Sequence, residues 1–144
     1  GYWNRPQETA SSFADGFFLT GDVGYMAEDG FFYIVDRKKD MIISGGFNIY
    51  PGDLESILLQ HPDVAEAAIV GAASDRWGET PFGFVVPRTG SRIDADALRE
   101  WANERLGRMQ KIAGIALRKE LPRSSIGKIL KQELARDPAL RQVQ

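Results

Sequence analysis

The sequence predicts an α+β fold, in which a small mixed sheet with flanking helices follows a short β-rich segment. The chain is rich in glycine and aromatic residues up to about residue 36, a composition typical of strands and tight turns. From residue 41 onward, short apolar runs alternate with apolar residues at helical spacing. The expected order in this second part is strand, helix, strand, strand, helix, strand, helix.

The β-rich segment is expected to hold strands at residues 17–20 and 31–35, where aromatic and β-branched residues follow one another. The Glu-Asp-Gly sequence at 28–30 is typical of a hairpin turn between strands. A charged run at 37–40 follows and is the predicted linker. We therefore expect residues 1–36 to be the tail of a larger domain and residues 41–144 to form a mobile α/β domain. The absence of an initiator Met also suggests a piece of a longer protein.

The first elements of the α/β domain are a short strand at residues 41–43 and a helix from Pro51. Proline suits the first helical turn, and Leu54, Ile57 and Leu58 lie on one helix face. Asp94 or Asp96 would cap a second helix, and a final short helix is expected at 129–135. The remaining strands are predicted at residues 64–70, 82–86 and 115–117.

The composition argues against several classes of protein. Lys and Arg total 18 and Asp and Glu total 20, so the net charge of −2 gives no basic surface for nucleic acid. Cysteine is absent and His61 is the one histidine, so neither disulfides nor a metal site are expected. No apolar run is long enough to cross a bilayer and no signal peptide is recognised, so a cytoplasmic location is expected.

Two segments of the first part carry polar groups that could bind a nucleotide. Asp22 follows Thr20 and Gly21 at the end of a predicted strand, where a carboxylate can accept hydrogen bonds from ribose hydroxyls. Arg37 could bind ribose or phosphate, and Lys39 could belong to a hinge. A plain Gly-Asp turn and a solvated charged corner are the simpler interpretations.

Two segments of the second part break local rules. Gly45 and Gly46 follow a strand and would let a pantetheine arm approach the backbone, although a bulge or tight turn explains them equally well. Lys128 lies just before or within the first turn of the last helix, where a cation opposes the helix dipole by about 0.3–1 kcal/mol. The surrounding residues 123–128 are not a phosphate-binding Walker A loop, because Pro122 and Ile129 replace required residues. An ordinary surface lysine is the simpler alternative.

Five motifs in order resemble the C-terminal part of the adenylate-forming enzymes, which include acyl-CoA synthetases and peptide synthetase adenylation domains. The first is Gly-Tyr-Trp-Asn at residues 1–4, and the second is Phe-Leu-Thr-Gly-Asp at 18–22. The third is Val-Asp-Arg-Lys-Lys-Asp at 35–40, and the fourth is Ser-Gly-Gly-Phe-Asn-Ile-Tyr-Pro at 44–51. The last runs from Leu121 to Leu130. The fourth motif is most similar to those of fatty-acyl and related carboxylate–CoA ligases.

The resemblance implies a role for each candidate residue. Asp22 would bind the ribose hydroxyls of ATP, and Arg37 would assist at the nucleotide. Lys128 would bind ATP and bridge the substrate carboxylate and the α-phosphate as the catalytic residue. Lys39 would be the hinge about which the small domain rotates between the two half-reactions. The pantetheine arm of coenzyme A would be bordered by Gly45, Gly46 and Phe47.

The implied function is that of a carboxylate–CoA ligase that forms an acyl-adenylate and then an acyl-CoA. Its substrates would be a small carboxylic acid, ATP with Mg²⁺, and coenzyme A, with ATP and Mg²⁺ held mainly by a large N-terminal domain that this chain lacks. The fragment alone is expected to be inactive. Family members often have Tyr-Lys and then Pro where this chain has Met109, Gln110 and Ile112. The alternatives are an adenylation domain that loads a carrier protein and a non-catalytic α/β interaction module.

Overall fold

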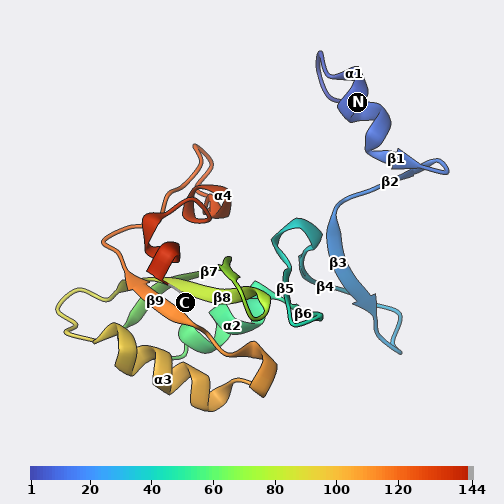
Figure 1. Ribbon diagram of the computed structural model, residues 1–144. Coiled ribbons are helices and arrows are strands. Elements are labelled where there is room, and N and C mark those ends of the chain that lie inside the picture. The colour runs from blue at the N-terminus through green and yellow to red at the C-terminus, as the bar shows by residue number, and fades with distance from the viewer. Residues whose placement is uncertain (143–144) are drawn as a thin grey trace. The chain divides into compact units, whose positions relative to one another are not determined.

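The computed structural model describes residues 1–142, and the chain divides into two compact units, Gly1–Lys39 and Asp40–Gln144 (Figure 1). The first unit holds two two-stranded sheets, and the second holds one five-stranded sheet. No helix among residues 1–142 is long and apolar enough to cross a membrane.

The first unit begins with a helix that the sequence reasoning missed and a very short hairpin. Helix α1 (Pro6–Ser11) has its proline in the first turn, where the missing N–H costs nothing. Strands β1 (Phe13–Ala14) and β2 (Phe17–Phe18) pair antiparallel. The turn between them has positive φ at Asp15 and Gly16, as a two-residue hairpin turn of this kind requires.

The longer hairpin of the first unit pairs β3 (Asp22–Met26) with β4 (Phe32–Arg37). Its turn lies at the predicted Glu-Asp-Gly sequence, and β4 confirms the strand expected at 31–35. The strand expected at 17–20 is confirmed only in its first half, because β2 ends at Phe18, where it pairs with β1. Strand β3 was not predicted, because it contains Asp and Gly, which are uncommon in strands. Gly24 is needed there because a Cβ would lie 2.5 Å from the carbonyl oxygen of Tyr33.

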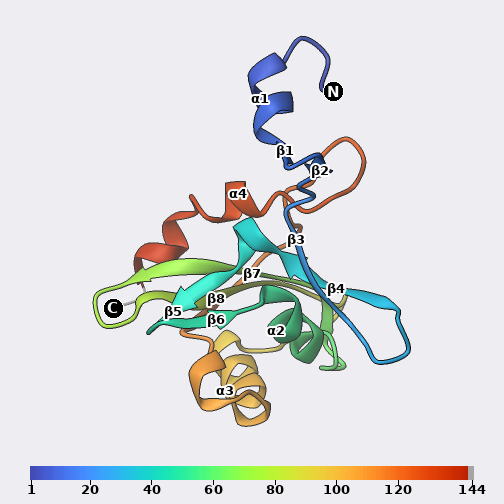
Figure 2. The ribbon, with the colours of Figure 1, turned by 90° about the vertical axis from the view of Figure 1, so that its right-hand side faces the viewer.

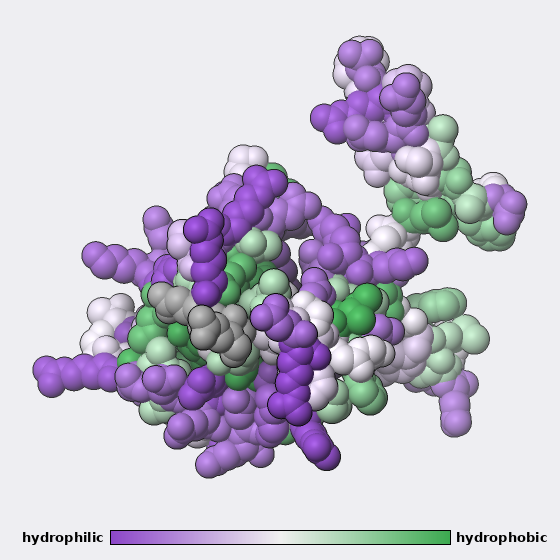
Figure 3. All heavy atoms as spheres, viewed as in Figure 1, coloured by the Kyte–Doolittle hydropathy of each residue, from purple (hydrophilic) through white to green (hydrophobic). Residues whose placement is uncertain are grey.

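The first unit has no core of its own. No side chain of residues 1–39 is buried, and Trp3 and Phe32 are 95% and 77% exposed. Figure 3 shows apolar residues, in green, at the surface of both of its hairpins. Burial of apolar area supplies most of the stabilisation of a fold, and these hairpins bury too little of it within the first unit to be stabilised in this way.

The second unit is built on a mixed five-stranded sheet in the order β6-β5-β8-β7, with β9 parallel to β8. The two long central strands form an antiparallel hairpin and run well beyond the predicted 64–70 and 82–86. Strand β6 was not predicted, because its three residues follow two glycines directly and give too short a run to indicate a strand. The strands are β5 (Ile42–Ser44), β6 (Phe47–Ile49), β7 (Val64–Ser74), β8 (Gly78–Pro87) and β9 (Gly114–Leu117).

Helices cover both faces of this sheet (Figures 1 and 2). Helices α2 (Pro51–Leu58) and α3 (Ala95–Arg105) pack on one face, around a core that includes Leu54, Ile69 and Leu98. The other face carries α4 (Lys131–Leu134) and a 3₁₀ turn (Pro138–Gln142), around a second core that includes Phe84. Two further 3₁₀ turns span Lys38–Asp40 and Arg108–Gln110.

The structure settles the start of two predicted helices. Asp94, rather than Asp96, caps α3, because its Oδ1 accepts from the backbone N–H groups of Asp96 and Ala97 at 3.0 Å. The last helix is shorter than the predicted 129–135 and begins only at Lys131. Lys128 therefore lies just before the helix and not within its first turn.

Candidate functional site

Asp22 and Arg37, the two predicted nucleotide-binding residues, form an ion pair within the first unit. They face each other across the β3–β4 hairpin, and Arg37 Nε lies 2.8 Å from Asp22 Oδ1. The Asp22 side chain is 25% exposed and the Arg37 side chain 51% exposed. An ion pair this accessible adds only about 0–1 kcal/mol to stability. Its main effect is to hold side by side two groups that suit ribose hydroxyls and phosphate.

The start of β3 differs from the expectation that Asp22 would end a strand. Asp22 is the first residue of β3, and its backbone N–H donates to Thr20 Oγ1 at 3.1 Å. The carbonyl oxygen of Gly21 accepts from the backbone N–H of Lys38 at 2.8 Å. The tight Thr-Gly-Asp turn is thereby fixed to the end of β4, which positions the carboxylate.

Lys39 lies in the 3₁₀ turn Lys38–Asp40 and is exposed. The division between the two units falls directly after it. Its role as a hinge stays a prediction.

Gly45 and Gly46 form the tight turn between β5 and β6, with Ser44 paired to Phe47. Their φ values of 55° and 82° are both left-handed, which glycine adopts without strain. Gly45 also lies against Trp77: its N–H donates to the Trp77 carbonyl oxygen at 2.9 Å, and a Cβ there would lie 2.8 Å from the indole ring. The turn needs glycine at this position, and it leaves Phe47 exposed.

A hollow of about 230 Å³ opens beside this glycine turn. It contains three cationic side chains, and the Arg76 guanidinium lies 4.6 Å from the centroid of the Trp77 ring. Cations beside an aromatic face suit a ligand that carries phosphate groups and a flat ring. The lining residues come together from distant segments: Ser44, Arg76, Trp77, Thr80, Arg108, Met109 and Lys111. Of these, Ser44 belongs to the predicted glycine motif and Met109 is a departure from the family pattern, and the sequence reasoning missed the other five.

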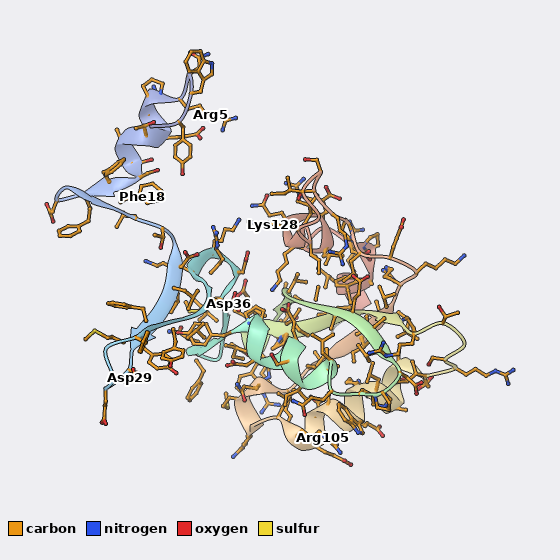
Figure 4. The ribbon with its side chains drawn as sticks, turned by 180° about the vertical axis from the view of Figure 1, so that it is seen from behind. Arg5, Phe18, Asp29, Asp36, Arg105 and Lys128 are labelled. Carbon is orange, nitrogen blue, oxygen red and sulfur yellow. The ribbon has the colours of Figure 1, made fainter. Side chains whose placement is uncertain are left out.

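Lys128 is held in a short turn, which we call the lysine loop and which spans residues 122–130. The N–H of Ser124 donates to the Lys128 carbonyl oxygen at 2.8 Å, and Gly127 has a φ of 81°. Leu130 N–H donates to the Pro122 carbonyl oxygen at 2.8 Å, which closes the base of the loop. Lys128 itself is exposed, on the side of the sheet opposite the helix that carries Arg105 (Figure 4). A fixed backbone thus presents a free-standing cation.

The lysine loop is joined to the rest of the second unit at the start of α4. Lys131 Nζ lies 2.7 Å from Glu55 Oε1, which also accepts from the backbone N–H of Ile69 at 2.8 Å. Both charged side chains are 20% exposed. This carboxylate connects α2, β7 and α4. Helix α2, which follows the glycine turn, and helix α4, which follows the lysine loop, are thereby fixed to each other.

The structure therefore pairs Asp22 with Arg37, and it joins Gly45, Gly46 and Phe47 in one turn. Among residues 1–142, no three His, Cys, Asp or Glu side chains gather in a way that could hold a metal ion.

Residues 53–128, just over half of the sequence, match the family of AMP-binding enzyme C-terminal domains. The chain belongs to this family. The match ends on Lys128. The resemblance to the C-terminal part of the adenylate-forming enzymes is thereby confirmed, and so is the predicted α+β fold class.

Relatives cover almost the whole chain. A 2-succinylbenzoate–CoA ligase of Geobacillus kaustophilus is 47% identical over 94% of this chain and 28% of its own length. A long-chain-fatty-acid–CoA ligase of Bacillus subtilis is 46% identical over 93% of this chain and 24% of its own length. The solved o-succinylbenzoate CoA synthetase of Bacillus subtilis, bound to an acyl-adenylate intermediate, superposes with a TM-score of 0.85 at 40% identity, over 94% of this chain and 28% of that one. The chain spans about a quarter of the length of such relatives.

Proposed function

We propose that this chain is the C-terminal part of an ATP-dependent carboxylate–CoA ligase. The observation that carries the proposal is the likeness to named CoA ligases at 46–47% identity along nearly the whole chain. The exposed lysine on a fixed loop and the glycine turn beside a cationic hollow fit the two half-reactions of such an enzyme. The large N-terminal domain of the same enzyme, absent here, would supply the acid-binding pocket and most of the ATP site.

In the first half-reaction, a carboxylate oxygen of the acid attacks the α-phosphorus of ATP and pyrophosphate leaves. Asp22 accepts hydrogen bonds from the ribose hydroxyls, and Arg37 assists at the nucleotide. Lys128 lies between the carboxylate and the α-phosphate. Its charge offsets the negative charge that builds up there in the transition state. Mg²⁺ would neutralise phosphate charge while held by the missing domain.

In the second half-reaction, the thiol of coenzyme A loses its proton, its sulfur attacks the acyl carbon, and AMP leaves. The thiol comes with the substrate, which fits a chain without cysteine. Gly45, Gly46 and Phe47 border the pantetheine arm. The cationic hollow beside Gly45 supports this assignment, because coenzyme A carries phosphates and an adenine ring. Lys111 lies next to the place where the family's usual lysine is replaced by Gln110.

The domain assignment is part of the same proposal. Residues 1–36 are the tail of the large domain, residues 37–40 are the linker, and residues 41–144 are the mobile domain. The division of the chain after Lys39 supports a hinge at this residue. The lack of any buried side chain in residues 1–39 fits a segment that packs on a missing body. A non-catalytic module would need to cover these exposed apolar side chains in another way.

The test is Lys128→Ala in the full-length parent enzyme, with both half-reactions measured. Acyl-adenylate formation should fall by at least about 100-fold, whereas acyl-CoA formation from supplied acyl-AMP should be unchanged. Lys119→Ala removes another exposed lysine of the same unit and should change neither rate. Normal adenylate formation by the Lys128 variant would refute the proposal.

The acceptor is tested by offering the parent enzyme free coenzyme A and a phosphopantetheinylated carrier protein. The names of the relatives favour free coenzyme A. Faster transfer of the acyl group to the carrier protein than to coenzyme A would show that the parent enzyme is an adenylation domain that loads a carrier protein. The 144-residue chain alone should form no acyl-CoA, because most of the groups that position the reactants are absent.

A further inference from the structure

One arginine ties the lysine loop to the sheet. Arg123 donates from Nη1 to the carbonyl oxygen of Gly127 at 2.7 Å, and it pairs through Nη2 with the carboxylate of Glu66 on β7. Gly127 immediately precedes Lys128, so this contact fixes the peptide that leads into the lysine. A planar guanidinium, whose donors point in fixed directions, suits such a two-sided contact.

Glu66 faces the lysine loop because β7 contains a bulge. Val64 pairs with Pro87 but Glu66 pairs with Val86, so Ala65 is an extra residue in the strand. In a regular strand, Val64 and Glu66 would share a face. Here Val64 belongs to the core under α2 and α3, whereas Val86, opposite Glu66, packs with the core on the α4 side. The bulge thus turns one carboxylate to the face that carries the loop.

We propose that Arg123, held by Glu66, is a positioning residue for Lys128 during acid activation. This inference rests on the proposed function, which gives Lys128 its role. A charge that stabilises a transition state must be placed to within about 0.5 Å by its supports. Apart from Arg123, the turn is held by backbone hydrogen bonds and by Ser124 Oγ, which accepts from Lys128 N–H at 3.2 Å. Arg123 is the support that connects the tip of the turn to the sheet.

Stability alone does not explain this contact. The Arg123 and Glu66 side chains are 43% and 36% exposed, and ion pairs of this kind contribute little to the free energy of folding. The buried Leu121 and Leu134 hold the loop's two ends on the sheet independently of Arg123. Loss of the guanidinium should therefore loosen the turn without unfolding the domain.

The experiment compares Arg123→Ala, Glu66→Gln and the double variant in the full-length parent enzyme. Arg123→Ala should lower kcat for adenylate formation by about 10- to 100-fold, as expected for a misplaced catalytic group, and leave KM for ATP unchanged. Acyl-CoA formation from supplied acyl-AMP should stay within about twofold, which also reports that the protein is folded. Glu66→Gln should have a smaller effect, and the double variant should be no slower than Arg123→Ala, because the two residues act as one unit.

Arg92→Ala is the matched control: it removes another exposed arginine of the second unit, with no side-chain partner among residues 1–142. Equal loss of both half-reactions in Arg123→Ala would overturn the inference, since that result means a general structural role. Normal adenylate formation in Arg123→Ala, beside its loss in Lys128→Ala, would also overturn it. Normal adenylate formation in Lys128→Ala would instead refute the proposed function, and this inference with it.

Discussion

The two units of the chain differ in how they are held together. Residues 1–39 contain a helix and two hairpins but no buried side chain. The second unit contains two hydrophobic cores, one on each face of its sheet. Local hydrogen bonds alone rarely stabilise a two-stranded hairpin in water, whereas a packed core does. The first unit therefore lacks the apolar burial that stabilises the second.

This difference bears on the candidate residues. The Asp22–Arg37 pair lies in the unit without a core, so its geometry depends on two short strands and their register. The glycine turn and the lysine loop lie on the unit with two cores, where they are fixed by Trp77, Glu55 and Arg123. In the proposed rotation of the second unit between the two half-reactions, this internal rigidity would keep each loop in shape while the unit moves as a body.

The contrast in apolar burial between the two units is tested most directly by truncating one phenylalanine in each unit of the 144-residue chain. Phe84 is fully buried beside Phe82, so Phe84→Ala should cost about 3–5 kcal/mol of unfolding free energy. Phe32 is exposed, so Phe32→Ala should change it by less than about 0.5 kcal/mol. Urea unfolding followed by circular dichroism measures both. Similar losses for the two variants would mean that the first unit has a core after all.

A smaller effect is expected from alanine at the glycine turn. Gly45→Ala adds a left-handed strain of about 1–2 kcal/mol and a clash with the Trp77 ring. Gly46→Ala adds the strain alone, because no atom lies within 4 Å of its Cβ position. The difference between their unfolding free energies in the 144-residue chain therefore isolates the contact with Trp77. Equal values would show that the ring moves freely aside.

The same unfolding experiment can include Gly24→Ala in the first unit. A Cβ at residue 24 would lie 2.5 Å from the carbonyl oxygen of Tyr33, which is closer than the 2.8 Å between a Cβ at residue 45 and the Trp77 ring. We nevertheless expect no shift of the main unfolding transition, because that transition reports the two cores of the second unit. A clear shift would show that the two units unfold together.

Much of the second unit could be predicted because its signals are local. Pro51 and the spacing of Leu54, Ile57 and Leu58 predict α2, and an aspartate ahead of an apolar stripe predicts α3. Strand β3 escaped prediction because Asp22 and Gly24 are poor strand formers that cross-strand pairing accommodates. Strand β6 escaped it because the strand has only three residues, which lie between a glycine turn and the start of α2.

The sequence predicts which residues belong to the candidate site, but not how they are arranged in space. The motifs named Asp22, Arg37, Gly45 and Lys128 from the resemblance, and no spacing rule indicated that Asp22 and Arg37 face each other. That pairing depends on the register of a hairpin. The hollow beside Gly45 depends on a contact with Trp77, which the β7–β8 hairpin brings near, and local sequence carries no signal for it.

A modest effect, smaller than that of Phe84→Ala, is expected from the carboxylate that anchors the C-terminal 3₁₀ turn to the second unit. Asp137 accepts two hydrogen bonds from Arg118 Nη2 at 2.8 and 2.9 Å, and one from the backbone N–H of Ala139 at 2.8 Å. The hydrogen bond from Arg118, followed by that from Ala139, lowers the pKa of Asp137 below its ordinary value of 3.8. Its unfolded form therefore binds a proton at a higher pH than its folded form does.

The contribution of Asp137 to stability is thus fully present above about pH 4 and is lost as the pH falls through the lowered pKa. Asp137→Asn should reduce the unfolding free energy of the 144-residue chain by about 1 kcal/mol at pH 7. The difference from the unsubstituted chain should shrink as the pH is lowered below 4, because the unfolded Asp137 carboxylate then binds a proton that the folded one does not. Urea unfolding at pH 7, 5 and 3 measures it. If the difference in unfolding free energy is the same at all three pH values, the charge of Asp137 adds nothing to the stability of the second unit. The difference in stability between the two units would then rest on the two apolar cores alone.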